Sequence, residues 1–102
     1  MIIYRTTKLD AFQHDFSLKD QLRRSALSIS SNIAEGYERE TIKEFIRFLY
    51  IAKGSCGELR SQIYVFNKIG FLLEDNFNEI YDLSKILARK IQSLINYLKT
   101  TL

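Results

Sequence analysis

The chain has 102 residues, which predicts a single domain over residues 1–102, because one hydrophobic core usually serves about 100–150 residues. With 46% hydrophobic and 26% charged residues, no proline and four glycines, the composition excludes a disordered chain. The net charge of +3 permits an acidic partner without requiring one. No stretch approaches the roughly 20 apolar residues of a bilayer-spanning helix, and no secretory signal is recognisable at the start. We therefore expect a cytoplasmic protein that does not enter membranes.

The first residues give the weakest pattern in the chain. Ile2, Ile3, Tyr4 and Leu9 would fill two turns of a helix. At about 8–9 residues such a helix is marginal alone, so we expect only a shortened first helix.

A longer helix is predicted from Ser17, as its N-cap, to about Glu38. One of its stripes is apolar and consists of Leu18, Leu22, Ala26, Ile29 and Ile33. A second stripe, which we expect on the other side of the helix, consists of Arg24, Ser28, Ser31, Glu35 and Arg39. Because serine is an indifferent helix former, tertiary packing must hold this segment together.

The next helix is predicted from Thr41 to about Ile69, after a short connection that makes a helical hairpin. Thr41 is the expected N-cap, with Glu44 at the capping-box position, and Gly70 is expected to end the helix. The apolar residues recur at gaps of four and three, as Phe45, Leu49, Ala52, Cys56, Leu59, Ile63 and Phe66.

Two glycines, Gly54 and Gly57, interrupt the middle of this helix. They lack the Gly-Lys-Ser/Thr ending of a phosphate-binding loop. Each costs a helix about 1 kcal/mol relative to alanine. We therefore expect that a neighbouring helix approaches closely at both glycines.

The last helix is predicted to begin near Glu74 and Asp75 and to end near Lys99, as the helix dipole favours. It carries a wide apolar stripe, typical of a bundle helix, made of Phe77, Ile80, Tyr81, Ser84, Leu87, Ala88, Ile91, Leu94, Ile95, Leu98 and Leu102. The opposite face is polar and consists of Lys85, Arg89, Gln92, Asn96 and Lys99. The fold class is therefore all-α, with three long helices and a short first one.

The sequence offers no catalytic residue, metal site or cofactor site. His14 and Cys56 are the only residues of their kinds and lie far apart, so neither a metal site nor a nucleophile with a base is expected. Cys56 lies within the apolar stripe and is predicted to be a buried core residue, and His14 a surface residue. We expect a protein that is not an enzyme.

Two blocks carry a family resemblance, QLRRSALSISSNIAEGYER at residues 21–39 and EFIRFLYIAKGSCGELR at residues 44–60. Together they resemble the signature of the 23S ribosomal RNA intervening-sequence proteins. With the last helix, the likeness covers about residues 16–100. It implies a small bacterial protein, an antiparallel up-down four-helix bundle and assembly into a homopentamer. Similar bundles are accessory proteins of diversity-generating retroelements, where the basic oligomer surface is thought to engage nucleic acid and a reverse transcriptase.

An incomplete first helix would leave apolar stripes of its neighbours exposed, which gives a physical reason to expect an oligomer. Five aromatic residues could lie at such contacts or equally in the core, namely Tyr4, Phe12, Tyr50, Tyr64 and Tyr81. Five signature positions are expected to be structural or to make hydrogen bonds between helices or subunits, namely Asn32, Glu35, Gly36, Gly54 and Glu58.

The basic excess of the chain lies in residues 41–70. We therefore hypothesise that RNA or DNA binds through phosphate contacts to Arg23, Arg24, Arg39, Lys43, Arg47, Lys53 and Arg60. Two alternatives remain. These residues could be a solvated surface with intrahelical pairs such as Glu35 with Arg39, or the protein could be a scaffold that docks a polypeptide partner without nucleic acid.

Overall fold

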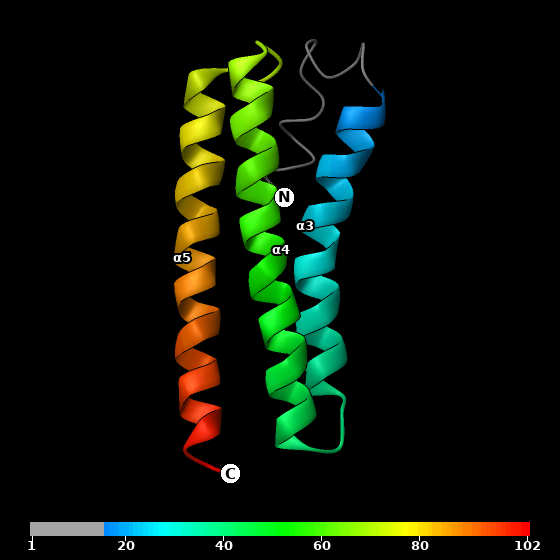
Figure 1. Ribbon diagram of the computed structural model, residues 1–102, viewed down its shortest axis with the longest axis vertical. Coiled ribbons are helices and arrows are strands. Elements are labelled where there is room, and N and C mark those ends of the chain that lie inside the picture. The colour runs from blue at the N-terminus through cyan, green and yellow to red at the C-terminus, as the bar shows by residue number, and fades with distance from the viewer. Residues whose placement is uncertain (1–15) are drawn as a thin grey trace.

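The computed structural model describes residues 16–102, which form three α-helices and no strand (Figure 1). Helix α3 runs from Phe16 to Tyr37, α4 from Ile42 to Lys68 and α5 from Glu74 to Lys99. Successive helices are antiparallel. The predicted all-α class is confirmed. The predicted short first helix, and with it the fourth helix of the expected bundle, lies outside the described residues.

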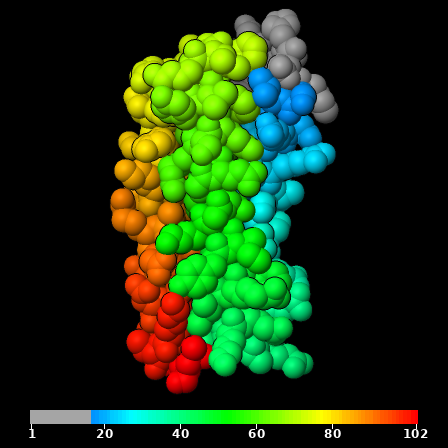
Figure 2. Space-filling view, in the orientation of Figure 1, coloured from blue at the N-terminus to red at the C-terminus, as the bar shows by residue number. Residues whose placement is uncertain are grey.

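Helix α4 is the central element of the described part of the chain. It packs against both α3 and α5, whereas no Cα atom of α3 comes within 8 Å of one in α5. In the space-filling view α4 occupies the middle of the visible face, between α5 and α3 (Figure 2). None of the helices in residues 16–102 has both the length and the apolar character needed to cross a membrane.

The inward side of α4 contributes more residues to the hydrophobic core than either of the other two helices. Its buried residues are Ile46, Leu49, Ala52, Ser55, Cys56, Leu59, Ile63 and Phe66. The predicted apolar stripe of this helix is therefore confirmed, except that Phe45 is only partly buried and Ile46 and Ser55 join it. The stripe is broad because it must serve a neighbour on either side.

Both ends of α4 follow the predicted capping. The Thr41 side chain accepts a hydrogen bond from the Glu44 backbone N–H at 3.2 Å. At the other end, Gly70 adopts φ +85°, the left-handed region that favours glycine. The Phe71 N–H donates to the Phe66 carbonyl at 2.8 Å and the Gly70 N–H to that of Asn67 at 3.2 Å, which is a Schellman motif.

Two expectations for α3 were wrong. Ser17 is not the N-cap, because the helix already includes Phe16. Ser28 does not lie on an outer stripe, because its Oγ is 3.0 Å from the Ser55 Oγ of α4. Ser25 is also buried there, and its hydroxyl donates to Glu58 at 3.3 Å. The side of α3 that meets α4 is thus shifted from its apolar stripe toward the small polar residues.

The glycines that permit close packing are not the ones expected. A Cβ on Gly36 would lie 2.8 Å from the Phe48 Cβ, so the end of α3 touches α4 there. A Cβ on Gly54 would meet nothing within 4 Å, and one on Gly57 would meet only the Arg60 guanidinium at 3.7 Å. The expected close approach at Gly54 and Gly57 is wrong, because a Cβ at either position would have no atom of another helix within 4 Å.

Helix α5 buries only part of its predicted apolar stripe. The buried residues are Ile80, Ser84, Ala88, Ile91, Ile95 and Leu98. Leu94 and Leu102 are exposed instead. Because α5 meets α4 but not α3, the side of α5 that includes Leu94 has no helix covering it among the described residues.

Candidate nucleic-acid interface

A row of polar and aromatic side chains follows the junction of α4 and α5, on the side away from the core. We call it the α4–α5 seam. Its members from α4 are Tyr50, Lys53, Arg60, Tyr64 and Lys68, and its members from α5 are Tyr81, Lys85, Gln92, Asn96 and Lys99. The two halves come together because residues four and three apart share a helix face, and because α4 and α5 run antiparallel side by side.

Two lysines cross between the helices in one half of the seam. The Lys53 Nζ donates to Gln92 Oε1 at 2.6 Å, and Gln92 in turn donates to Asn96 Oδ1 at 2.9 Å. The Lys99 Nζ donates to the Tyr50 hydroxyl at 2.8 Å, and this hydrogen bond lowers the pKa of Tyr50 from its ordinary value. Both ammonium groups thus donate hydrogen bonds to uncharged side chains.

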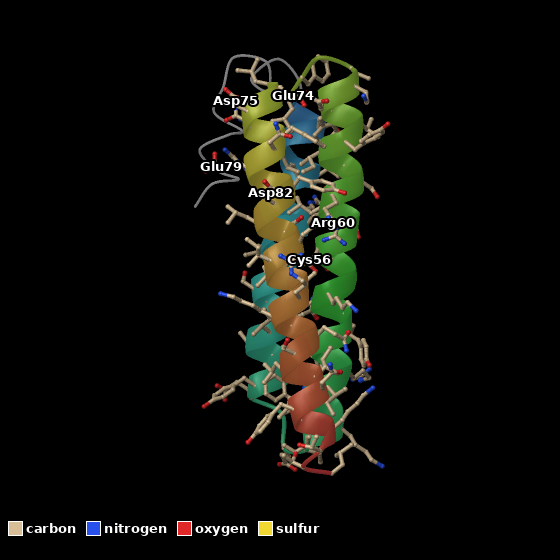
Figure 3. The ribbon with its side chains drawn as sticks, turned by 90° about the vertical axis from the view of Figure 1, so that its left-hand side faces the viewer. Cys56, Arg60, Glu74, Asp75, Glu79 and Asp82 are labelled. Atoms are coloured by element: carbon tan, nitrogen blue, oxygen red, sulfur yellow. The ribbon has the colours of Figure 1, made fainter. Side chains whose placement is uncertain are left out.

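The other half of the seam contains an open pocket of about 510 Å³, which we call the tyrosine pocket. Its lining is Gly57, Arg60, Ser61, Tyr64, Val65 and Tyr81. Arg60 reaches from α4 to donate to the Ser84 carbonyl of α5 at 3.4 Å (Figure 3). A lysine lies near each tyrosine ring: Lys68 is 5.3 Å from the centroid of Tyr64, and Lys85 is 5.4 Å from that of Tyr81.

Charge is segregated along α5. Its carboxylates, Glu74, Asp75, Glu79 and Asp82, all lie in the first third of the helix, as Figure 3 shows. All its cations follow, as Lys85, Arg89, Lys90 and Lys99. The seam as defined therefore contains five cations (Lys53, Arg60, Lys68, Lys85 and Lys99) and no carboxylate. From Lys85 to Lys99 it extends about 21 Å at 1.5 Å per residue.

The seven cations predicted to bind nucleic acid do not gather in one patch. Lys53 and Arg60 belong to the seam. Arg39 and Arg47 meet at the other side of α4, where their guanidinium carbons lie 4.9 and 5.0 Å from the centroid of the Phe48 ring. The other three lie elsewhere, with Lys43 exposed on α4 and Arg23 and Arg24 on α3.

Two of the predicted cations pair with carboxylates on their own side of the molecule. Arg24 is 2.9 Å from Asp20 and Arg39 is 2.7 Å from Glu35, both at helical i,i+4 spacing. The pair of Glu35 with Arg39 is the one that the solvated-surface alternative predicts. Surface pairs of this kind contribute only about 0.3–0.5 kcal/mol, but they reduce the net charge offered to a phosphate.

The remaining signature residues lie mainly between α3 and α4. Glu58 accepts a hydrogen bond from Ser25 across the two helices. Asn32 donates within α3, to the Ser28 carbonyl at 2.8 Å and to the Ser28 Oγ at 3.1 Å, and Ser28 contacts Ser55 of α4. Gly36 is a packing residue, whereas Gly54 is exposed.

Cys56 is fully buried in the core, as predicted. Burial raises the pKa of its thiol, and the nearby Arg60 charge opposes this only in part. Within residues 16–102 no three metal-binding side chains of His, Cys, Asp or Glu come together. The thiol is therefore held in its protonated, unreactive form at neutral pH.

We expect the Cys56 thiol to react with a maleimide far more slowly in the folded chain than in denaturant. The buried thiol must first become exposed, and its raised pKa keeps the reactive thiolate scarce as the pH rises through the usual range of thiols. Stopped labelling followed by mass measurement gives both rates. An exposed thiol supplies the control, as Ser93→Cys combined with Cys56→Ala. Equal labelling rates for the two folded chains would contradict the buried assignment.

A second surface feature is an apolar groove of about 510 Å³ where the end of α3 faces α4 and α5. It is lined by Ser30, Ile33, Ala34, Tyr37, Glu38, Phe45 and Leu94. Tyr37 is 73% exposed, and Tyr97 of α5 is 64% exposed. Among the described residues, this part of α3 and α5 therefore presents apolar and aromatic side chains at the surface.

Comparison with known proteins gives one family and a shared fold. Residues 1–93 match the family described as 23S rRNA-intervening sequence protein. A solved structure from Bacteroides thetaiotaomicron VPI-5482, a protein of unknown function from the S23 ribosomal protein family, is similar with a TM-score of 0.83. It is 23% identical, and the match covers 92% of this chain and 87% of that chain. No curated protein matches the chain.

Proposed function

Because the chain belongs to the 23S rRNA-intervening sequence protein family, we propose that it is a nucleic-acid-binding protein without enzymatic activity, which holds RNA or DNA by its phosphates along the α4–α5 seam. The observation that carries this proposal is the grouping of Lys53, Arg60, Lys68, Lys85 and Lys99 without a carboxylate in the same row. Cations placed in this way attract a polyanion and release its condensed counterions.

The seam suits a phosphate backbone better than it suits sequence reading. Its cations are spread along two neighbouring helices, and those of α5 alone extend about 21 Å, from Lys85 to Lys99. Reading base edges in a duplex instead requires side chains that enter a groove. Lys53 and Lys99 are also held in place by Gln92 and Tyr50. Binding through such contacts is expected to depend on salt and to be largely indifferent to sequence.

We further propose that the protein works as a homo-oligomer, and a homopentamer is the assembly that the family resemblance implies. The apolar groove and the exposed tyrosines Tyr37 and Tyr97 support this proposal, because apolar patches of this kind are normally covered by a partner. Repeating the seam in every copy would multiply the positive surface. Sedimentation of the unmodified chain tests the assembly, and a monomer at high concentration would contradict it.

Reversing two charges of the seam, as Lys53→Glu with Lys99→Glu, is expected to weaken RNA and DNA binding at least about 10-fold at low salt. Each lost phosphate contact should also reduce the slope of log affinity against log salt by about one. Gel retardation of a structured RNA and of a DNA duplex at several salt concentrations measures both quantities. Circular dichroism checks that the variant is still helical.

The matched control is Arg24→Glu with Lys90→Glu, which changes the net charge equally but lies outside the seam. It should lose much less affinity. Equal losses in the two variants would show that net charge alone governs binding, against the seam. If the unmodified chain retards neither nucleic acid at low salt, the proposed function is wrong.

The second candidate function is a scaffold that docks a polypeptide partner without nucleic acid. The apolar groove between α3, α4 and α5 favours it, because most of its lining residues are apolar or aromatic and one of them, Tyr37, is largely exposed. In this case the seam variants would leave the function intact. Substitution of Tyr37 by a charged residue would abolish docking instead.

A further inference from the structure

We propose that the tyrosine pocket takes up one unpaired base, so that the seam prefers single-stranded nucleic acid to a duplex. This inference deepens the proposed function and rests on it. It assigns a ligand to a site formed by α4 and α5 together, which is lined by Gly57, by Arg60 and by two tyrosines, Tyr64 and Tyr81, that we call its walls. Lys68 and Lys85 lie near the two tyrosine rings.

The two walls have the same construction on two antiparallel helices. In each wall a tyrosine is followed four residues later by a lysine that lies near its ring, as Tyr64 with Lys68 and Tyr81 with Lys85. A flat aromatic ligand that enters the pocket can therefore contact tyrosine rings while its charged substituents meet lysines. A nucleotide has this combination, an aromatic base joined to phosphates.

The walls differ in how firmly they are held. Tyr81 is only partly exposed, and its ring stacks on Phe77 with centroids 5.5 Å apart. Tyr64 is 53% exposed, so its ring is available to a ligand and free to adjust. One held ring and one accessible ring in the same pocket offer aromatic surface on which any base can stack, because every base has a π-face.

Gly57 lines the tyrosine pocket, although packing inside the chain does not require a glycine at this position. Glycine weakens a helix relative to alanine, yet a Cβ at position 57 would meet nothing but the flexible end of Arg60, at 3.7 Å. Packing inside the chain therefore does not require Gly57. A side chain there would extend into the pocket, whose volume of about 510 Å³ lies within the range typical of small-ligand sites.

The shape of the pocket also separates single strands from duplexes. A paired base lies inside the helical stack and reaches a protein pocket only after it is unpaired and unstacked, which is costly. An unpaired base enters freely. The cations along the rest of the seam attract both forms, so discrimination between them must come from the pocket.

The experiment compares an oligouridylate with an RNA duplex of the same length. Tyr64→Leu is expected to weaken binding of the single strand about 10-fold, the usual effect of losing one stacking ring, and to leave duplex binding nearly unchanged. Tyr64→Phe keeps the ring and should retain binding. Leu27→Ala removes a comparably exposed apolar side chain of α3, which lines neither the pocket nor the apolar groove, and should have no effect.

Filling the pocket provides a second test that keeps every charge and every ring. Gly57→Leu should weaken single-strand binding about 10-fold by occupying the place of the base. Gly54→Leu adds the same side chain where a Cβ meets nothing within 4 Å, and it should not change binding. Both replace a helical glycine by a strong helix former, so neither is expected to unfold the chain.

The possible results separate this inference from the function on which it rests. Selective loss of single-strand binding in Tyr64→Leu and Gly57→Leu supports the pocket. If the unmodified chain binds strand and duplex equally and neither variant changes this, the pocket assignment is overturned while the seam stands. If the unmodified chain binds neither ligand at low salt, both the seam and the pocket are overturned.

Discussion

Leu49→Ala is expected to lower the free energy of unfolding by about 2–5 kcal/mol. Leu49 is completely buried on the inward side of α4, the helix that contacts both α3 and α5. Truncation removes apolar area from the core and leaves a cavity. The surrounding helices can relax into this cavity only in part. Urea denaturation followed by circular dichroism measures the change.

A nearby residue of α4 supplies the control for this truncation. Ile51 is 43% exposed and lies two residues away, on another side of the helix. Ile51→Ala should therefore change the free energy of unfolding by no more than about 0.5 kcal/mol. Similar losses for Leu49→Ala and Ile51→Ala would show that the core does not lie where the structure places it.

Gly36→Ala is expected to lower the free energy of unfolding by about 1–3 kcal/mol, although alanine is the better helix former. The added Cβ would lie 2.8 Å from the Phe48 Cβ and 3.3 Å from the Phe45 carbonyl oxygen. Both atoms are fixed to the backbone of α4, so a side-chain rotation cannot relieve the overlap. The two helices would have to move apart at the end where α3 leads into α4.

The opposite result is expected one helix away. Gly54→Ala should raise the free energy of unfolding by up to about 1 kcal/mol, because the new methyl group meets no atom within 4 Å and alanine favours the helix. The pair of variants is measured under the same denaturation conditions. Stabilisation by Gly36→Ala, or a large destabilisation by Gly54→Ala in the isolated chain, would contradict the placement of these glycines.

Periodicity alone was sufficient to predict the central helix. The gaps of four and three from Phe45 to Phe66 place those residues on one side, and the structure buries all of them except Phe45, which is half-buried. Thr41 and Gly70 were equally readable, because the backbone geometry at a helix end restricts which residues can stand there. The extent and the ends of α4 depend on interactions between residues close in the chain, so they can be predicted from a single sequence.

Which small residues meet another helix could not be predicted in the same way. Ser28 and Gly54 are both small, and their spacing does not reveal that the first contacts α4 while the second faces away from both neighbours. The choice depends on how α3 and α5 are placed around α4. That placement is a property of the whole fold and leaves no signature at a single position.

The candidate site was only partly predictable for a related reason. Residues 71–102 contain four acidic and four basic side chains. This equal count does not show that the acidic residues lie in the first part of α5 and the basic ones in the rest. Lys85 and Lys99 are predicted on a polar face, but the contacts of Lys99 with Tyr50 and of Arg60 with Ser84 depend on the register between two antiparallel helices. Charge counts along a chain do not contain that register.

Because α3 and α5 pack on separate sides of α4, we expect local unfolding of the described residues to involve one outer helix at a time. The two outer helices share no close backbone approach, so either can detach while the other hairpin remains intact. Local unfolding can then begin either with detachment of α3 or with detachment of α5. In both cases the amides of α4 are expected to exchange their hydrogens with solvent last. A ligand that contacts both α4 and α5 would oppose detachment of α5 and would not affect detachment of α3.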